Sequence, residues 1–198
     1  FNPDIILVTH GHSDHLGDAM ELSNKNNIPV AAIHEISLFL SKQGINNIGV
    51  NIGGSFIYRG VKFTMLDAKH SSVLDIVEEP LPAGDAASFL ITLEDGTKQF
   101  HAGDTGLFGD MKTIIGEIYK PDIALLPIGD KFTMGPFEAA LATRWIDSKV
   151  AIPMHYNTFP PIGQDPSIYA NFVSQLNPNI DVVILNPGEY FEYNPENY

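Results

Sequence analysis

Hydrophobic and polar positions follow two alternating patterns along the chain. Short apolar runs bounded by turn residues are typical of buried strands, and apolar residues every three or four positions are typical of amphipathic helices. We expect strands at residues 4–9, 29–33, 55–58, 61–68, 87–94, 98–102, 122–127, 149–154 and 181–185. We expect helices at residues 16–24, 35–43, 109–119, 136–147 and 166–176. The order of these elements favours a layered α/β fold.

Two turns and one long loop interrupt this pattern. Arg59-Gly60 and Asp95-Gly96 each separate two strand-like runs, which predicts two hairpins in the middle of the chain. Residues 71–85 contain Pro80 and Pro82 and have no clear periodicity. A loop of that length in a folded domain often has a function, so we expect one there.

Length and composition exclude several classes of protein. A chain of 198 residues, 44% of them hydrophobic, is long enough to bury the core of one domain. Its apolar runs are far shorter than the roughly 20 residues that span a bilayer. The formal net charge of −13 disfavours binding to nucleic acid and to anionic membranes. The absence of cysteine excludes disulfides and thiolate nucleophiles, and it fits a cytoplasmic location.

Four side chains that can bind a metal ion lie within six residues. His10, His12, Asp14 and His15 follow the first predicted strand and precede the first predicted helix. A loop held by a strand can direct several side chains at one point. Imidazole and carboxylate groups together suit zinc, iron or manganese. A metal site is therefore a better explanation of this segment than a chance cluster of histidines.

Three further candidate ligands each come just after a later predicted strand. They are His70, Asp104 and His155. In layered α/β proteins, ligands bind at the edge of the sheet where the strands end. We therefore expect these three side chains to join the His-rich segment in one site.

The order and spacing of these seven residues resemble those of the metallo-β-lactamase superfamily, over essentially the whole chain. Within that superfamily the chain is similar to the bacterial and archaeal metal-dependent hydrolases related to L-ascorbate-6-phosphate lactonase. The closer similarity lies in residues 101–108, 129–136 and 153–156. The resemblance implies a four-layer αββα sandwich.

The resemblance also implies two divalent metal ions, zinc first, with manganese, iron or nickel as alternatives. His10, His12 and His70 would hold one ion, Asp14, His15 and His155 the other, and Asp104 would bridge them. Aspartate at position 104, where some members have cysteine, matches the branch that acts on esters, lactones and phosphodiesters.

Two such ions would share a hydroxide, which would attack a carbonyl or phosphoryl centre. We therefore expect a hydrolase whose substrate is a small anionic ester, lactone or phosphoester. One alternative is a metallo-nuclease or phosphodiesterase of the same superfamily, although no basic groove or added nucleic-acid-binding segment is visible. The other is a non-catalytic metal-binding protein.

Three residues are candidates for catalytic roles. Asp14 could orient the hydroxide, and Asp104 would bridge the metals. His101 is expected to fix a ligand carboxylate, which we favour, or to protonate the leaving group. Tyr156 is another candidate donor unless it only packs beside His155, and His34 is expected to be structural.

Residues 131–134 and 159 bring a charge and apolar side chains close to the expected site. Lys131 could hold an anionic substrate group or be an ordinary exposed lysine. Phe132, Met134 and Phe159 could line an apolar pocket wall or close the core.

The beginning of the chain departs from the resemblance. Relatives have strands before the His-rich segment that pair with its first strand, whereas this chain starts nine residues before His10. We therefore expect residues 1–198 to form a single domain that lacks its N-terminal strands. A sheet edge exposed in this way would favour pairing with a second copy, so a homo-oligomer is possible.

Overall fold

The structure is a computed structural model that describes residues 3–198. The strands are β1 (Ile6–Leu7), β2 (Val30–Ile33), β3 (Asn47–Val50), β4 (Ser55–Tyr58), β5 (Val61–Asp67), β6 (Val73–Leu74), β7 (Leu81–Pro82), β8 (Ala87–Thr92), β9 (Lys98–His101), β10 (Ile123–Pro127), β11 (Val150–Met154) and β12 (Asp181–Val182). The helices are α1 (Ser13–Leu16), α2 (Ala19–Asn26), α3 (His34–Lys42), η1 (Met111–Tyr119), α4 (Pro136–Ile146), η2 (Pro160–Ile162), α5 (Pro166–Leu176) and η3 (Pro195–Asn197). No helix among the described residues is both long and apolar enough to cross a membrane.

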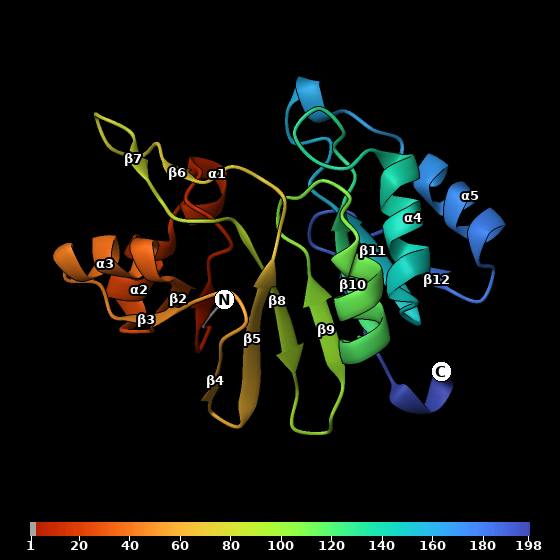
Figure 1. Ribbon diagram of the computed structural model, residues 1–198, viewed down its shortest axis with the longest axis horizontal. Helices are drawn as coiled ribbons and strands as arrows, with labels where there is room; N and C mark the ends of the chain where they lie inside the picture. The colour runs from red at the N-terminus through yellow and green to blue at the C-terminus, as the bar shows by residue number, and fades with distance from the viewer. Residues whose placement is uncertain (1–2) are drawn as a thin grey trace.

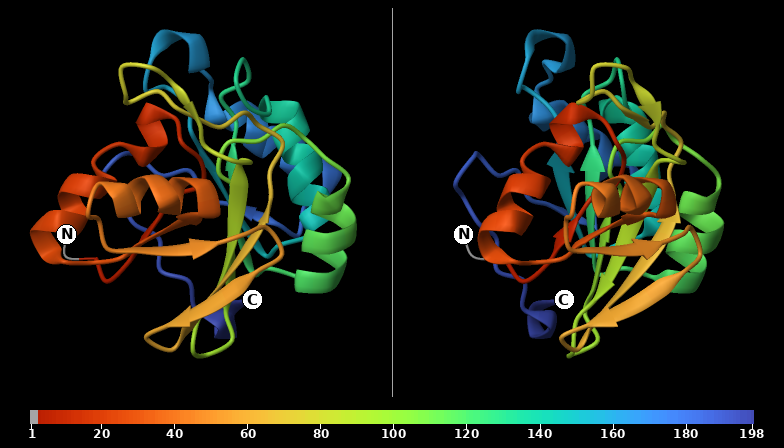
Figure 2. Two further views of the ribbon diagram at one scale, coloured as in Figure 1. Left: turned by 60° about the vertical axis from the view of Figure 1, so that its left-hand side comes forward. Right: turned by 90° about the vertical axis from the view of Figure 1, so that its left-hand side faces the viewer.

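Two sheets lie between two layers of helices. One sheet has the order β1-β2-β3, and the other has the order β12-β11-β10-β9-β8-β5-β4. Helices α2 and α3 lie on one side of the sheets, and η1, α4 and α5 lie on the other (Figure 1). Figure 2 shows the same layers from two other directions. The predicted four-layer αββα sandwich is therefore confirmed.

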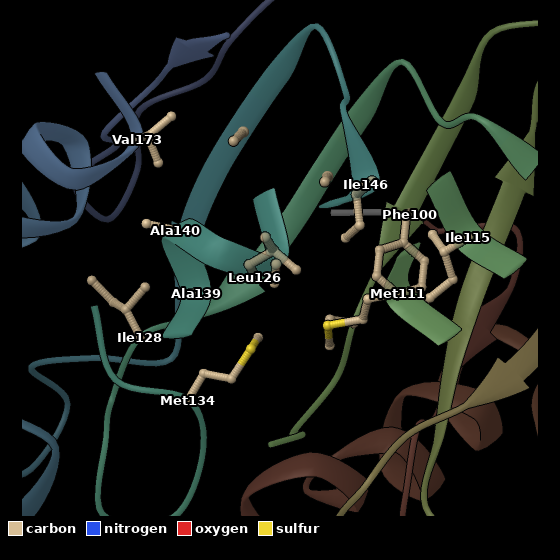
Figure 3. Packing of buried hydrophobic residues seen from close by; sticks show 14 of the residues in the cluster. Phe100, Met111, Ile115, Leu126, Ile128, Met134, Ala139, Ala140, Ile146 and Val173 are labelled. Atoms are coloured by element: carbon tan, nitrogen blue, oxygen red, sulfur yellow. The ribbon is translucent and has the colours of Figure 1, made fainter. Parts of the chain in front are cut away.

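Both faces of the central strands are buried. In β8, Ala87 and Phe89 point to one face and belong to the core shared with the three-stranded sheet. Leu90 points to the opposite face and belongs to the core under the helices. Side chains alternate between the two faces of a strand, so one strand contributes to both cores. Figure 3 shows the second core, in which Phe100 and Leu126 from the sheet pack with Met111 and other residues of the helices.

Local sequence explains the turns and the helix starts. Arg59 and Gly60 have φ angles of 50° and 87°, as a two-residue type I′ hairpin turn requires. Pro136 and Pro166 each occupy the first turn of a helix, where a missing N–H costs no hydrogen bond. Asp165 caps the second of these helices, because its side chain accepts a hydrogen bond from the N–H of Ser167.

Several predicted bounds were wrong. Gly17, with φ 39°, divides the helix expected at 16–24 into α1 and α2. The strands expected at 4–9 and 181–185 are shorter than predicted, because β1 and β12 each pair with a neighbouring strand over two residues. Strand β3 was not predicted, nor was the ribbon of β6 and β7 within residues 71–85. The helix expected at 109–119 begins at Met111 and is a π-helix.

The strand directions bring distant loops to one edge of the larger sheet. Strands β5 and β9 both run antiparallel to β8, so they point the same way. Strands β10 and β11 run parallel to β9 and to each other. The segments that follow β5, β9 and β11 therefore leave the sheet at the same end, which is the upper edge in Figure 1, close to α1.

Candidate metal centre

The His-rich segment is held between a strand and a short helix. The N–H of Val8 donates to the carbonyl of Ala31 at 2.9 Å, which fixes the chain up to the start of the segment. Helix α1 then places Asp14 and His15 on its first turn, and Leu16 is fully buried beneath them. The segment therefore projects its ligands from backbone that is anchored at both ends.

Side chains of the seven predicted residues come together in three groups, in each of which the ligand atoms lie within 4.8 Å of one another. The groups are His10, His12 and His70; His10, His15 and Asp104; and Asp14, His15 and His155. The first and third groups contain the same residues as the two ligand sets that the resemblance implies. The second group connects them.

Asp104 lies at the centre of this arrangement. Its Oδ2 atom is 3.3 Å from Nε2 of His15, 3.3 Å from Nε2 of His155 and 3.7 Å from Nε2 of His70. Its side chain is only 5% exposed. One buried carboxylate, to which water has little access, thus contacts imidazoles of both sets.

The donor atoms of this cluster fit divalent metal ions. Among the described residues, three buried side-chain atoms have no hydrogen-bond partner, namely Nε2 of His15, Oδ1 of Asp104 and Nδ1 of His155. Buried polar atoms without partners are costly and rare in folded proteins. Imidazole nitrogen and carboxylate oxygen are ligands of zinc, iron and manganese, so a cation would satisfy Nε2 of His15 and Oδ1 of Asp104. Nδ1 of His155 lies across its ring from the Nε2 atom that faces Asp14 and Asp104.

Burial and neighbouring charges set the protonation of these groups. Burial, with repulsion from His15, lowers the pKa of His10 to about 3. Burial also lowers the pKa of His70. Burial opposes protonation of His15 as well, but the Asp104 and Asp14 carboxylates outweigh it and raise the pKa of His15. His10 is therefore neutral at neutral pH, which is the form that binds a metal.

Thr9 orients the most buried of the ligands. Its Oγ1 atom lies 3.0 Å from Nδ1 of His10, and both residues are buried. Gly103 packs directly against this threonine, since a Cβ on Gly103 would lie 2.9 Å from Cβ of Thr9. A hydrogen bond to the second ring nitrogen fixes the orientation of a ligand imidazole. Sequence analysis gave Thr9 no role.

Thr105 joins the loops that carry His70 and Asp104. Its Oγ1 accepts a hydrogen bond from the N–H of Lys69 at 2.9 Å and donates one to the carbonyl of Gly106 at 2.8 Å. The N–H of Gly106 donates to the carbonyl of Lys69 at 3.0 Å. Sequence analysis also gave Thr105 no role, because its partners are distant in sequence and its residue type is common.

His155 has an unusual backbone. Its φ angle is 54°, in the left-handed region that residues other than glycine rarely adopt. Its carbonyl packs against Gly129, where a Cβ would lie 2.5 Å from that oxygen. A side chain at position 129 would therefore displace the turn that presents His155.

The loop at residues 71–85 packs over the His-rich segment. The N–H of Gly11 donates to Oγ of Ser72 at 3.2 Å, and a Cβ on Gly11 would lie 2.6 Å from Cβ of Ala83. The hydroxyl of Ser13 donates to Oδ2 of Asp75 at 3.4 Å. The loop for which we expected a function thus contributes to the walls of the site.

His101 lies behind the site and outside its cavity. Its Nδ1 accepts a hydrogen bond from the N–H of Gly103 at 3.2 Å, across the turn that leads to Asp104. Burial lowers the pKa of His101 to about 4, so its ring is neutral at neutral pH. Tyr156 packs against the core under the helices. His34 is exposed and begins α3.

A cavity of about 560 Å³ opens over the metal ligands. Asp14, His70 and His155 line one part of it, and Phe132 and Phe159 line another. Of the two alternatives for Met134, a pocket wall or the core, the structure supports the core under the helices, because the residue is 2% exposed and packs there.

Lys131 is exposed and is not among the described residues that line this cavity. Its Nζ atom lies 5.4 Å from the centroid of the Phe132 ring. The lysine thus stacks on the same aromatic ring that faces the cavity.

Comparison with known proteins agrees with this geometry. Residues 2–156 match the profile of the beta-lactamase superfamily domain. The chain is 98% identical over 198 residues to a UPF0173 metal-dependent hydrolase of Methanobrevibacter smithii, covering all of this chain and 83% of that protein. It is 39% identical to Igni18, a metallo hydrolase from Ignicoccus hospitalis, with a TM-score of 0.87 over 98% of this chain and 82% of the other. The metallo-beta-lactamase fold protein YhfI from Bacillus subtilis shares the fold at 14% identity, with a TM-score of 0.70 over 92% of this chain and 74% of that one.

Proposed function

The chain belongs to the beta-lactamase superfamily and is a metal-dependent hydrolase, and from this premise we propose that it acts through two divalent metal ions on a small anionic ester, lactone or phosphoester. His10, His12 and His70 would hold one ion and Asp14, His15 and His155 the other, with Asp104 between them. When bound, two such ions supply a hydroxide nucleophile at neutral pH and offset the charge that develops on the substrate. Zinc is the first candidate, and manganese, iron and nickel are the alternatives.

The position of Asp104 carries this proposal. A single oxygen lies within 3.7 Å of ring nitrogens from both predicted ligand sets. A buried carboxylate flanked by three imidazoles is costly unless positive charge accompanies it. Divalent cations held by the two ligand sets would supply that charge.

Asp14 differs from the other ligands in its exposure. Its side chain is 56% exposed and lines the cavity, while its Oδ2 atom lies 3.4 Å from Nε2 of His155. A carboxylate in this position can accept a hydrogen bond from the attacking water and direct its lone pair at the substrate. We assign Asp14 that orienting role.

His101 acts as a positioning residue in this proposal. It holds the turn that leads to Asp104 through its bond with the N–H of Gly103. Its neutral ring and its place outside the cavity argue against direct proton donation to a leaving group. The alternative nuclease function is disfavoured by the formal net charge of −13, and no lysine or arginine is among the described residues that line the cavity.

The test is to quantify bound metal in the purified protein and to assay it on lactones, carboxylate esters and phosphoesters. We expect about two ions per chain, and hydrolysis of at least one class that a chelator abolishes and added metal restores. Cleavage of nucleic acid alone would support the nuclease. Metal binding without turnover on any class would support a non-catalytic metal-binding protein.

A further inference from the structure

Two phenylalanine side chains form one apolar surface inside the cavity of the metal centre. Phe132 follows β10 and Phe159 follows β11, and both line the cavity. Their ring centroids are 6.2 Å apart with 31° between the ring planes. That distance is within the range of contacting aromatic pairs, so no ligand ring fits between them. We name this surface, made of Phe132 and Phe159, the aromatic wall.

The aromatic wall remains available to a ligand. Phe132 is 46% exposed and Phe159 is 40% exposed, although phenylalanine is among the residues most often buried. The neighbouring Met134 shows that the same loop can bury an apolar side chain fully. A ligand that covers exposed apolar area inside a cavity binds more tightly, because that area is removed from water.

The charges in the cavity restrict what can lie against the aromatic wall. Asp14, Asp75 and Asp104 line the cavity, and no lysine or arginine is among its described lining residues. Bound metal would supply most of the positive charge in the cavity, while the ammonium of Lys131 lies outside its described lining, 5.4 Å from the centroid of the Phe132 ring. An anionic substrate group therefore has to lie at the ligands, and a second one near Asp75 would be repelled.

The aromatic wall is held by hydrogen-bonded turns. The N–H of Asp130 donates to the carbonyl of Met134 at 3.0 Å, which closes the turn that carries Phe132. The N–H of Asn157 donates to the carbonyl of Ile162 at 3.0 Å, which closes the turn that carries Phe159. A surface fixed in advance contributes to selectivity because little ordering is needed on binding.

We propose that the aromatic wall selects substrates that carry a neutral, phenyl-sized apolar group on the side of the scissile bond away from the metal ligands. This inference rests on the proposed hydrolytic function, which places the scissile bond at those ligands. It names the substrate class as aryl- or alkyl-substituted lactones and esters.

The test compares an unsubstituted five-membered lactone with the same lactone bearing a phenyl group, because the scissile bond is the same in both. For Phe132→Ala and Phe159→Ala, we expect kcat/KM for the phenyl lactone to fall about tenfold, and for the unsubstituted lactone to change less than about twofold. Phe137→Ala is the matched control, because Phe137 is 47% exposed and lies on α4 outside the described lining of the cavity. It should change neither value.

A binding measurement separates this inference from the proposed function. We would measure binding of phenylacetate and acetate to the metal-loaded protein by ligand-observed NMR. Tighter binding of phenylacetate that both wall variants weaken supports the aromatic wall even if neither lactone is hydrolysed. Equal binding of the two acids, or equal losses for both lactones, would overturn it. A change of oligomeric state in the wall variants, with selectivity unchanged, would show instead that the surface contacts a second copy.

Discussion

Asp104 and His15 meet at the centre of the site, with Oδ2 of the carboxylate 3.3 Å from Nε2 of the imidazole. They come from different halves of the fold, because His15 lies in the helix after β1 and Asp104 follows β9. Both side chains are largely buried, at 5% exposure for Asp104 and 16% for His15. The pair therefore links the two sheets through a contact that water screens little.

Replacing Asp104 by asparagine keeps its shape and removes its charge. We expect the variant Asp104→Asn to bind less than the full complement of metal and to lose at least about a hundredfold in kcat/KM, because both proposed ions lose a ligand. Elemental analysis and steady-state kinetics check this. Glu21→Gln removes an exposed charge on α2 and should match the unaltered protein in both measurements. Full metal content and activity in the Asp104→Asn variant would show that Asp104 does not act as a metal ligand.

Thr105 offers a test of how the loops are held together. Thr105→Val removes the hydroxyl that bonds Lys69 and Gly106 but keeps the shape of the side chain. We expect metal affinity to fall about 10–100-fold, as for other partners that position metal ligands. Thr105→Ser retains the hydroxyl and should stay close to the unaltered affinity. Chelator competition measures both, and equal affinities for the two variants would contradict the role.

Gly103 and Gly96 form a matched pair, since both have positive φ angles, 61° and 90°. A Cβ at Gly96 would meet open space, whereas one at Gly103 would meet Thr9 and the carbonyl of Ala87. We expect Gly96→Ala to cost about 1 kcal/mol of unfolding free energy from backbone strain. Gly103→Ala should cost at least about 2 kcal/mol more because of overpacking. Denaturant unfolding checks this, and equal losses would show that the loop relaxes.

A buried hydrogen bond joins α4 and α5. The Thr143 hydroxyl donates its hydrogen to the carbonyl of Ala139. The Tyr169 hydroxyl lies 2.6 Å from Oγ1 of Thr143, so Tyr169 is the donor and Thr143 the acceptor in that hydrogen bond. We expect Tyr169→Phe to lower the unfolding free energy by about 1 kcal/mol and the melting temperature by about 2–4 °C. Tyr190→Phe, at a side chain 86% exposed, should leave both unchanged.

The same tyrosine predicts how stability depends on alkaline pH. Burial raises the pKa of Tyr169 well above its ordinary value. The unfolded chain therefore releases this proton near pH 10 while the folded protein retains it, so unfolding free energy falls as pH rises above about 10. We expect a shallower fall in Tyr169→Phe than in the unaltered protein, measured by denaturant unfolding from pH 8 to 11. Parallel curves would show that Tyr169 ionises equally in both states.

The positions of the candidate ligands could be predicted from the sequence because the ends of the strands can be. His70, Asp104 and His155 each follow an apolar run, and parallel strand directions bring such ends to one edge. The metal roles of these residues stay predictions until metal is measured. The single domain lacking its N-terminal strands also stays a prediction.

Other features depend on contacts that sequence patterns do not contain. Thr9 and Thr105 have ordinary local sequences, and their importance arises from neighbours brought by the fold. Phe132 and Met134 are both apolar residues of one loop, yet Phe132 lines the cavity and Met134 belongs to the core under the helices. Strand β3 is an Asn-Ile-Gly-Val segment whose extended form depends on pairing with β2.

The contribution of both sheets to one cluster of ligands has a consequence for the assembled protein. The core between the sheets contains side chains of both, with Leu16 and Val30 from one half and Met65 and Phe89 from the other, so the halves are docked by apolar packing as well as by the ligand cluster. A cation held by His15 from one half and His155 from the other can bind tightly only when the halves are docked. By mass action, the resistance of that junction to heat and proteases then rises with the free metal concentration in the surroundings. The supply of metal in a cell would thereby affect how long the protein survives as well as how fast it works.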